Sequence, residues 1–302
     1  MTQQTSVSNR AWIELILLSF IWGGSFLSIR VALDEIGFMS AVAHRVFWGM
    51  LILWAYIAIR RLPVPRDWRI WGAFLIMGIL NNAIPFSLMA WGQLHIETGL
   101  TSILNAATAV FGILLASLFF VDEKLTPRRL IGVLLGFFGV AIAIGLHNLT
   151  NFDLRSLAQL AVIGGTVSYA FASIWARKTL SGLPPQVAAA GMVTGASVVM
   201  VPAAWLIEGP ISLNLSADTT LAIGYYAVIA TAVAYLLYYR VLQMAGSGNL
   251  MLCTLLVAPV AIILGAVVLG EALHPQAYVG FAILALGLIV IDGRLLGAKH
   301  RQ

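Results

Sequence analysis

The sequence predicts an all-α membrane protein of about ten transmembrane helices, and three observations point to this fold class. Of the 302 residues, 61% are apolar and only 10% are charged. A soluble domain carries roughly 25% charged residues, so this composition cannot cover a surface that faces water. Long apolar runs recur along the chain, each close to the ~20 residues that a helix needs to cross a bilayer. The runs also lack the alternation of polar and apolar residues typical of membrane β-strands.

The expected helices follow one another with short polar loops between them. The first run comes after a polar segment and is long enough to span, so no cleaved signal peptide is expected. Prolines and glycines such as Pro63, Pro65, Pro184, Pro185 and Gly209 separate later runs. The expected ranges are 11–32, 38–59, 68–92, 98–121, 127–146, 156–179, 186–207, 218–242, 248–270 and 275–296.

The basic residues predict how these helices are oriented. With the N-terminus in the cytoplasm, 14 of the 17 Lys and Arg residues fall on the cytoplasmic side. Only Arg30, Arg45 and Arg155 lie toward the outside. Cytoplasmic loops of membrane proteins carry an excess of Lys and Arg. Because an odd number of helices would break this alternation, we expect both termini on the cytoplasmic side.

An internal repeat divides the chain into two halves. Residues 121–127 and 269–275 share a Glu-x-Leu-x-Pro pattern at an offset of 148, which pairs Glu123 with Glu271. At the same offset Gly132 matches Gly280, and Gly139 matches Gly287. Five helices in each half would make the second half enter the membrane from the opposite side. The sequence therefore predicts two inverted five-helix repeats, residues 1–147 and 148–302, an arrangement common in secondary transporters.

These motifs resemble the EamA family of the drug/metabolite transporter superfamily. The Glu-x-Leu loop followed by a Gly-rich last helix occurs in both halves, and the segment from Ile21 to Phe26, Ile-Trp-Gly-Gly-Ser-Phe, is similar to the family's first helix. Asp122 stands where the family usually has Gly. Within the family the chain looks most like bacterial exporters of amino acids, of the aromatic amino-acid exporter type. The resemblance implies a multi-pass protein of the bacterial inner membrane that exports amino acids or similar small metabolites.

Polar and aromatic side chains at mid-depth mark the expected solute site, because polar groups without partners are costly in lipid. We expect a central cavity built from the first, third, fourth, sixth, eighth and ninth helices. Aromatic rings would hold an apolar side chain or an ammonium, and amides and hydroxyls would hold a carboxylate. Ser and Thr in such helices also often only bond their own backbone. The candidate substrate-binding residues are Trp22, Ser25, Asn82, Asn105, Tyr169, Thr231, Tyr235 and Tyr239.

Glycine pairs four residues apart are expected to pack helices rather than bind anything. Gly132 and Gly136 form one such pair, and Gly191 and Gly195 form another. Small residues at this spacing let two helix backbones approach closely. We therefore expect both pairs to be packing seams.

Titratable groups at mid-depth are scarce, which favours transport without proton coupling by alternating access. Glu14 lies about one turn into the first helix and is expected to reach the headgroups. Arg45, beside His44, has two equal interpretations: a structural one, in which it pairs with Glu35 or Asp34 or extends outward to the interface, and a functional one. A cavity with aromatic and amide groups but no buried acid or base would suit neutral amino acids. With one cysteine and five scattered histidines, neither a metal site nor a cofactor is expected.

Other readings stay open at this point. A proton-coupled exporter of organic cations, drugs or other metabolites would have the same fold, and a membrane-embedded enzyme is a more distant alternative. An enzyme would need clustered acid, base or nucleophilic groups at one depth, and a channel would need a selectivity filter or ring of charge. The sequence shows none of these patterns. We expect a single chain to suffice for transport. Its expected partners are a small-molecule substrate and the lipid bilayer, and no nucleic-acid partner is expected.

Overall fold

The computed structural model describes residues 7–96, 98–146, 150, 153, 156–269 and 275–292, and these are helical with short connections. No strand occurs in these ranges, which confirms the all-α class. The elements are α1 (Asn9–Leu33), α2 (Phe38–Arg60), α3 (Trp68–Gly78), η1 (Ile79–Ala83), α4 (Ile84–Gln93), α5 (Thr98–Phe119), α6 (Pro127–Ile144), α8 (Leu157–Thr179), α9 (Pro185–Glu208), α10 (Ala217–Gly224), η2 (Tyr225–Val233), α11 (Ala234–Ala245), α12 (Ser247–Leu250), α13 (Cys253–Leu269) and α14 (Pro275–Asp292).

Eight helical segments in the described part are both long and apolar enough to cross a membrane. Two of them are composite: Trp68–Gln93 joins α3, η1 and α4, and Ala217–Ala245 joins α10, η2 and α11. Two shorter apolar helices, Ile103–Phe119 and Ser247–Val260, accompany the eight. The chain is therefore a multi-pass membrane protein, and the count of ten spans stays a prediction.

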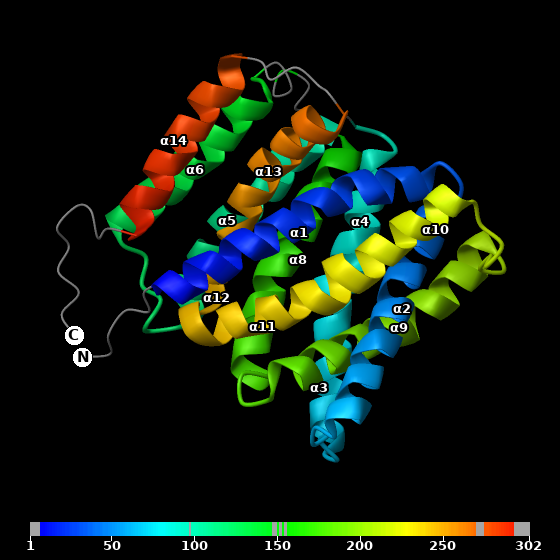
Figure 1. Cartoon of the computed structure of the whole chain (residues 1–302). Coiled ribbons are helices and arrows are strands. Elements are labelled where there is room, and N and C mark those ends of the chain that lie inside the picture. The colour runs from blue at the N-terminus through cyan, green and yellow to red at the C-terminus, as the bar shows by residue number, and fades with distance from the viewer. Residues whose placement is uncertain are drawn as a thin grey trace.

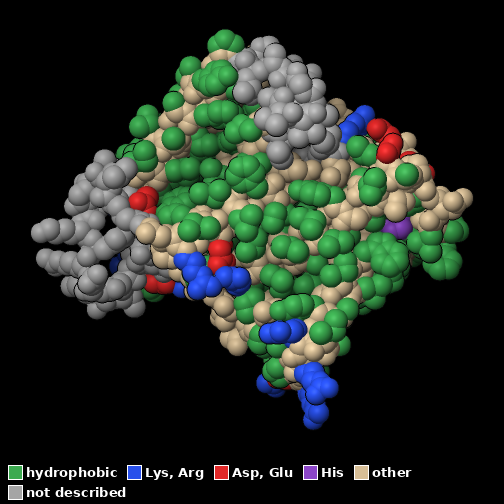
Figure 2. Space-filling view, in the orientation of Figure 1, with side chains coloured by type: hydrophobic (Ala, Val, Ile, Leu, Met, Phe, Trp, Pro, Cys, Tyr) green, Lys and Arg blue, Asp and Glu red, His purple; other side chains and the backbone are tan. Residues whose placement is uncertain are grey.

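Apolar side chains cover most of the surface shown in Figure 2, and Lys and Arg side chains gather toward its lower edge. Several of the outward-facing apolar residues are almost fully exposed, among them Leu206 at 84%, Ile59 at 79% and Leu118 at 78%. A soluble protein rarely exposes so many large apolar side chains together. Hydrocarbon is the solvent that suits this surface.

Helices α6 and α14 pack side by side at one edge of the bundle (Figure 1). Their glycines meet in reciprocal pairs. A Cβ on Gly132 would lie 2.8 Å from the carbonyl oxygen of Gly287, and a Cβ on Gly139 would lie 2.8 Å from that of Gly280. Gly132 and Gly280 are repeat partners, as are Gly139 and Gly287. Gly132 therefore contacts the repeat partner of Gly139, and Gly139 contacts the repeat partner of Gly132. Two halves related by a two-fold axis are expected to show this reciprocal pattern.

A second seam joins α3 to α9. A Cβ on Gly195 would lie 2.6 Å from the carbonyl oxygen of Phe74, and one on Gly191 would collide with the Phe74 ring. These two glycines and the Gly132–Gly136 pair are thus the packing seams that their spacing predicts.

Two π-helical segments lie at corresponding places in the two halves. In η1 the helix widens just before Pro85, which has no N–H to continue the regular hydrogen bonding. In η2 the hydroxyl of Thr231 donates to the carbonyl oxygen of Tyr226, five residues back, at 2.7 Å. Such wide turns are frequent at functional sites, and each one rotates the helix faces that follow it.

Candidate functional site

A cavity of about 100 Å³ lies inside the bundle, between the two π-helical segments. That volume is well above the roughly 15 Å³ needed for one water molecule. Among the residues that the structure describes, the lining contains no Asp or Glu and is mostly aromatic and apolar. The lining residues are Trp22, Ser25, Ile29, Ala41, Val42, Arg45, Asn81, Phe86, Met89, Ala90, Gln93, Asn105, Thr108, Tyr169, Tyr226, Tyr235, Tyr238, Met251, Cys253, Thr254 and Val257.

The lining reaches one end of the bundle. Ile29 is near the end of α1, Ala41 near the start of α2, and Gln93 is the last residue of α4. We call this the Gln93 end. At the other extreme the lining stops at Tyr238, Met251 and Cys253. The cavity is therefore placed toward the Gln93 end of the molecule.

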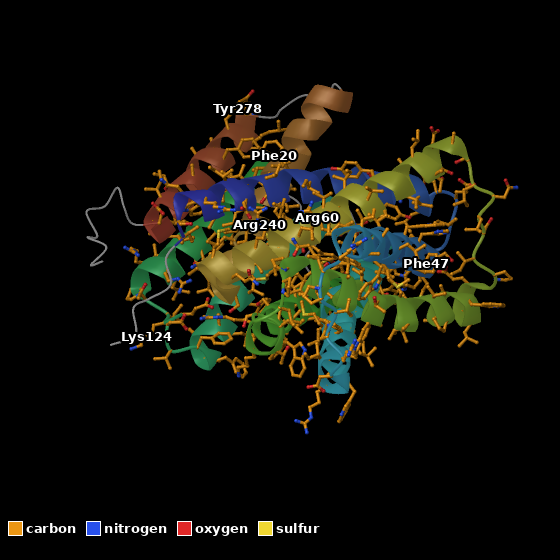
Figure 3. The ribbon with its side chains drawn as sticks, turned by 60° about the horizontal axis from the view of Figure 1, so that its bottom comes forward. Phe20, Phe47, Arg60, Lys124, Arg240 and Tyr278 are labelled. Atoms are coloured by element: carbon orange, nitrogen blue, oxygen red, sulfur yellow. The ribbon has the colours of Figure 1, made fainter. Side chains whose placement is uncertain are left out.

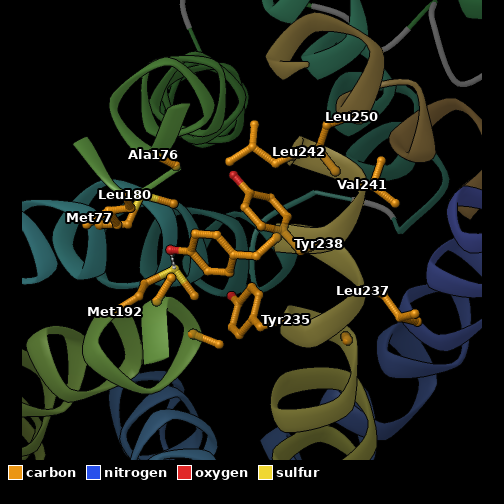
Figure 4. Packing of buried hydrophobic residues seen from close by; sticks show 14 of the residues in the cluster. Met77, Ala176, Leu180, Met192, Tyr235, Leu237, Tyr238, Val241, Leu242 and Leu250 are labelled. Atoms are coloured by element: carbon orange, nitrogen blue, oxygen red, sulfur yellow. Dashed lines mark hydrogen bonds between the residues drawn. The ribbon is translucent and has the colours of Figure 1, made fainter. Parts of the chain in front are cut away.

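Aromatic rings form one wall of the cavity. The ring centroid of Trp22 lies 6.3 Å from those of Tyr235 and Tyr238, and the two tyrosine rings are perpendicular at 6.0 Å. Figure 4 shows Tyr235 and Tyr238 projecting from α11 into the core. The indole N–H of Trp22 donates to the carbonyl oxygen of Ala230 at 3.1 Å, which fixes the ring. Phe86 and Tyr169 pack edge-to-face at 6.3 Å and also line the cavity.

Arg45 places a buried positive charge at the cavity. The residue is only 5% exposed. Its Nε donates to Thr231 Oγ1 at 3.0 Å, and its Nη2 donates to the carbonyl oxygen of Ala230 at 3.1 Å. The guanidinium lies 4.0 Å from the centroid of Phe86. Within the described ranges no carboxylate forms an ion pair with it.

The expected partners of Arg45 are engaged elsewhere, so that expectation was wrong. Asp34 pairs with Arg30 at 3.6 Å, and Glu35 accepts from the hydroxyl of Ser216 at 2.6 Å. Arg45 also does not extend outward to the interface, because its guanidinium is bonded to Thr231 and Ala230 inside the bundle and the residue is 5% exposed. The expectation that the cavity contains no buried base was also wrong, because Arg45 lines it.

His44, the neighbour of Arg45, faces away from the cavity. Its Nδ1 accepts from Trp48 Nε1 at 3.2 Å, and its Nε2 lies 3.1 Å from the carbonyl oxygen of Ser212. This pattern fits a neutral imidazole that carries its proton on Nε2. His44 thus links α2 to the loop that follows α9.

Five of the eight candidate residues line the cavity, and their role in binding remains a prediction. The five come from α1, α5, α8 and α11: Trp22, Ser25, Asn105, Tyr169 and Tyr235. The structure adds α2 to the helices expected to build the cavity, through Ala41, Val42 and Arg45.

The other three candidates lie behind the lining. Asn82 is fully buried and accepts from the hydroxyl of Tyr235. Thr231 holds Arg45. Tyr239 donates to the sulfur of Met192 at 3.5 Å, the dashed line in Figure 4. Asn82 and Thr231 contact residues of the lining, so both support side chains that face the cavity.

Three hydroxyls of the lining have no protein partner in the described part of the chain. They belong to Thr108, Tyr226 and Tyr238. Leaving a buried polar group without a hydrogen bond costs about 1–3 kcal/mol. Water or a polar solute in the cavity would satisfy these groups.

Glu14 takes part in an ion pair between helices instead of reaching the headgroups. Its carboxylate accepts from Arg240 at 2.5 Å and from Arg10 at 3.3 Å, and the residue is 6% exposed. Arg240 lies on α11 beside α1 (Figure 3). The expectation that Glu14 simply points to the headgroups was wrong, because Arg240 holds it against the bundle. Glu14 does not line the cavity.

A buried cluster closes the bundle at the end opposite Gln93. Glu123 is 0% exposed and accepts from the N–H and hydroxyl of Ser247, both at 2.8 Å, and from the N–H of Gly248 at 2.7 Å. Arg177 pairs with Glu123 and, at 2.5 Å, with Asp122. We call this the Glu123 cluster. It ties the loop after α5 to α8 and α12, which belong to the other half of the sequence.

The cluster gives a physical reason for the glutamate in the first copy of the Glu-x-Leu-x-Pro motif, because this carboxylate joins three elements of the bundle. Gly246 has φ +82°, and a Cβ there would lie 2.8 Å from the Glu123 carboxylate, so only Gly fits. The second copy of the motif, around Glu271, lies outside the described residues.

Comparison with known proteins identifies the family. The model of the EamA-like transporter family matches the chain twice, over residues 10–145 and 156–292. The chain belongs to the EamA-like transporter family. Its fold and its membership of the drug/metabolite transporter superfamily agree with the resemblance in the motifs. The protein is a membrane transporter and not an enzyme.

Several relatives cover nearly the whole chain. A protein of Streptantibioticus cattleyicolor named "Probable terminal-alkyne amino-acid exporter" is 26% identical over 97% of each sequence. One of Escherichia coli named "Probable amino-acid metabolite efflux pump" is 24% identical over 98% of each. A solved crystal structure of a further protein has a TM-score of 0.79 and 16% identity, and covers 95% of this chain and 99% of that one. The last likeness shows the fold alone.

Proposed function

We propose that this EamA-like transporter exports amino acids or similar small metabolites across a bacterial inner membrane. Its ten transmembrane helices form two inverted repeats, residues 1–147 and 148–302, with both termini in the cytoplasm. One chain suffices, and the central cavity alternates between the two sides of the membrane. The names of the two relatives support the direction and the class of solute.

The cavity is the observation that carries this proposal. It is enclosed by aromatic rings and amide and hydroxyl groups that come from both halves of the sequence. The hydroxyls of Thr108, Tyr226 and Tyr238 have no hydrogen-bond partner in the described part of the chain. If these side chains served only to pack the helices together, there would be no reason to bury such hydroxyls. A site between two repeats is where secondary transporters bind their solutes.

The closed Glu123 cluster supports alternating access. With the termini in the cytoplasm, this cluster lies on the cytoplasmic side and the Gln93 end lies outside. The structure then corresponds to an outward-facing state, in which contacts between the halves seal the inner side. Export requires the reverse state, in which Glu123 releases Ser247 and Gly248.

Transport is proposed to be uncoupled from protons. A proton-coupled carrier needs a titratable group in the pathway, usually a carboxylate. Asp and Glu are absent from the described lining, and both Glu14 and Glu123 are held by arginines outside it. The solute would therefore move down its own gradient.

Reconstitution tests the proposal. Liposomes containing the purified protein and loaded with labelled L-phenylalanine or L-leucine should release the label faster than empty liposomes, with or without a pH gradient. Trp22→Ala should slow release about 10-fold or more, because it removes the aromatic wall. Trp68→Ala is the matched control, since Trp68 is 77% exposed and lies away from the cavity. Release that needs an imposed pH gradient would refute the uncoupled mechanism, and equal rates in both variants would refute the site.

A further inference from the structure

We propose that Arg45 is the anion-binding residue of the cavity and that the transported solute docks a carboxylate on it. This inference rests on the proposed function and names the chemical group by which the site selects its solute. It excludes simple organic cations as substrates. The argument uses the geometry of the guanidinium, the charge of the cavity and the connections of Arg45 to both halves.

The guanidinium keeps donors free for a solute. Arginine has five N–H donors in a planar fork. Two of them bind Thr231 and the carbonyl oxygen of Ala230, so three have no protein acceptor within the described ranges. The ring of Phe86 supports one face of the plane at 4.0 Å. The side chain is thus held in one orientation, and its remaining N–H groups are available at the cavity wall.

The cavity carries one unbalanced positive charge. Arg45 is the single charged residue among its described lining residues, and it stays protonated at any physiological pH. Burying a charge is costly unless it is paired. The hydroxyls of Tyr169, Tyr226 and Tyr235 lie near enough to interact electrostatically, but they are neutral groups. An anion on the solute would supply the missing partner.

A carboxylate fits this site better than a phosphate. The planar fork of arginine matches a carboxylate through two parallel hydrogen bonds. A phosphate dianion would call for further cations, and the described lining offers none. The aromatic wall of Trp22 and Tyr238 leaves room for an apolar side chain and offers π faces to an ammonium. An amino acid has all three groups.

Arg45 also connects the solute site to both halves of the molecule. It extends from α2 and is held by Thr231 and Ala230 of η2. The carbonyl oxygen of Ala230 also accepts from Trp22 of α1. The anion site and the aromatic wall therefore share one backbone carbonyl on a π-helical segment, so Thr231 acts as a positioning residue for Arg45.

Analogues that lack one charge at a time test the inference. Binding to purified protein in detergent would be measured by calorimetry for L-phenylalanine, 3-phenylpropionate, L-phenylalaninamide and phenethylamine. The same measurement would be made for L-leucine and for its analogues that lack the amino group, the charge of the carboxylate, or the carboxylate itself. In each series we expect the two compounds with a carboxylate to bind at least ~10-fold more tightly than the amide and the amine, as expected for a hydrogen bond to a charged group.

Variants of Arg45 assign that preference to the residue. Arg45→Gln should weaken carboxylate binding at least ~10-fold and abolish the preference over the amide. Arg30→Gln is the matched control, because Arg30 is an exposed arginine in the last turn of α1, at the Gln93 end. Arg45→Lys keeps the charge without the planar fork and should give intermediate affinity. It also provides a second reading if the glutamine variant fails to fold.

The outcomes separate this inference from the proposed function. Equal binding of carboxylates, amides and amines, no binding of any carboxylate, or a preference that survives Arg45→Gln would overturn the inference. If carboxylates bind through Arg45 but no solute crosses liposomes, the inference holds and the transport proposal fails. If phenethylamine is transported and L-phenylalanine is not, the transporter stands and the inference falls.

Discussion

The Glu123 cluster allows the proposed closure of the cytoplasmic side to be tested with one substitution. Glu123→Gln keeps the shape of the side chain, removes its charge and turns an amide toward the N–H groups of Ser247 and Gly248. Breaking one partner of a buried ion pair costs about 3–5 kcal/mol. Because Arg177 keeps its contact with Asp122 at 2.5 Å, the lower value applies. About 3 kcal/mol corresponds to a ~150-fold shift toward the state in which this end is open.

Cys253 is the natural reporter of this opening. It is the single cysteine of the chain, it is buried, and it lines the inner part of the cavity. An impermeant maleimide applied to the cytoplasmic face of inside-out vesicles should label Cys253 up to ~150-fold faster in Glu123→Gln than in the wild type. Cys253→Ser gives the background. Glu35→Gln, which removes a carboxylate at the opposite end, should leave the rate unchanged. Equal labelling of wild type and Glu123→Gln would refute the proposal that the Glu123 cluster keeps this end closed.

Two further predictions concern stability. Gly139→Leu should destabilise the protein by about 1–3 kcal/mol, because its side chain would meet the backbone of α14, whereas Gly72→Leu, with nothing within 4 Å, should not; equal denaturant unfolding curves would contradict the seam. The pKa of Glu35 is lowered from 4.5 by the hydroxyl of Ser216, by Thr219 and by the backbone of Ser216. A lowered pKa contributes stability that is present above 4.5 and is lost as the pH falls through the folded value. Glu35→Gln should therefore lower the melting temperature at neutral pH but not in strong acid, and an equal effect at both would count against these hydrogen bonds.

The apolar runs, the low content of charged residues and the repeated glycines were enough to predict an all-α membrane fold and two of its packing seams. Gly132, Gly139, Gly280 and Gly287 pack as reciprocal pairs. Their constant offset predicted that they correspond. These features are local in the sequence or repeat at a fixed interval, so they can be recognised in a single sequence.

The candidate site was predicted less completely, for a geometric reason. Faces drawn with 3.6 residues per turn fail across a π-helical segment, where the wider turn rotates the faces that follow it. In η1 it is Asn81 and not Asn82 that lines the cavity, and in η2 Tyr226 lines it while Thr231 stands behind. On the regular helix α1, by contrast, the two candidate residues Trp22 and Ser25 both line the cavity.

Arg45 was misjudged because its environment depends on tertiary packing. An arginine two turns from a helix end normally extends to the interface. Here its guanidinium is bonded to Thr231 and Ala230 inside the bundle instead, and nothing local in the sequence reports this contact. The partners of Glu14 and Glu123 were missed for the same reason, since Arg240 and Arg177 lie far away in sequence.

Counterflow tests the central claim, that one cavity alternates between two sides, most directly. Proteoliposomes preloaded with unlabelled L-phenylalanine would be diluted into buffer containing a trace of the labelled compound. The account predicts a transient accumulation of label above its equilibrium level, which Trp22→Ala loses and Trp68→Ala keeps. Label that only rises smoothly to equilibrium, whatever is inside, would indicate an open pore or no specific site and would contradict the account.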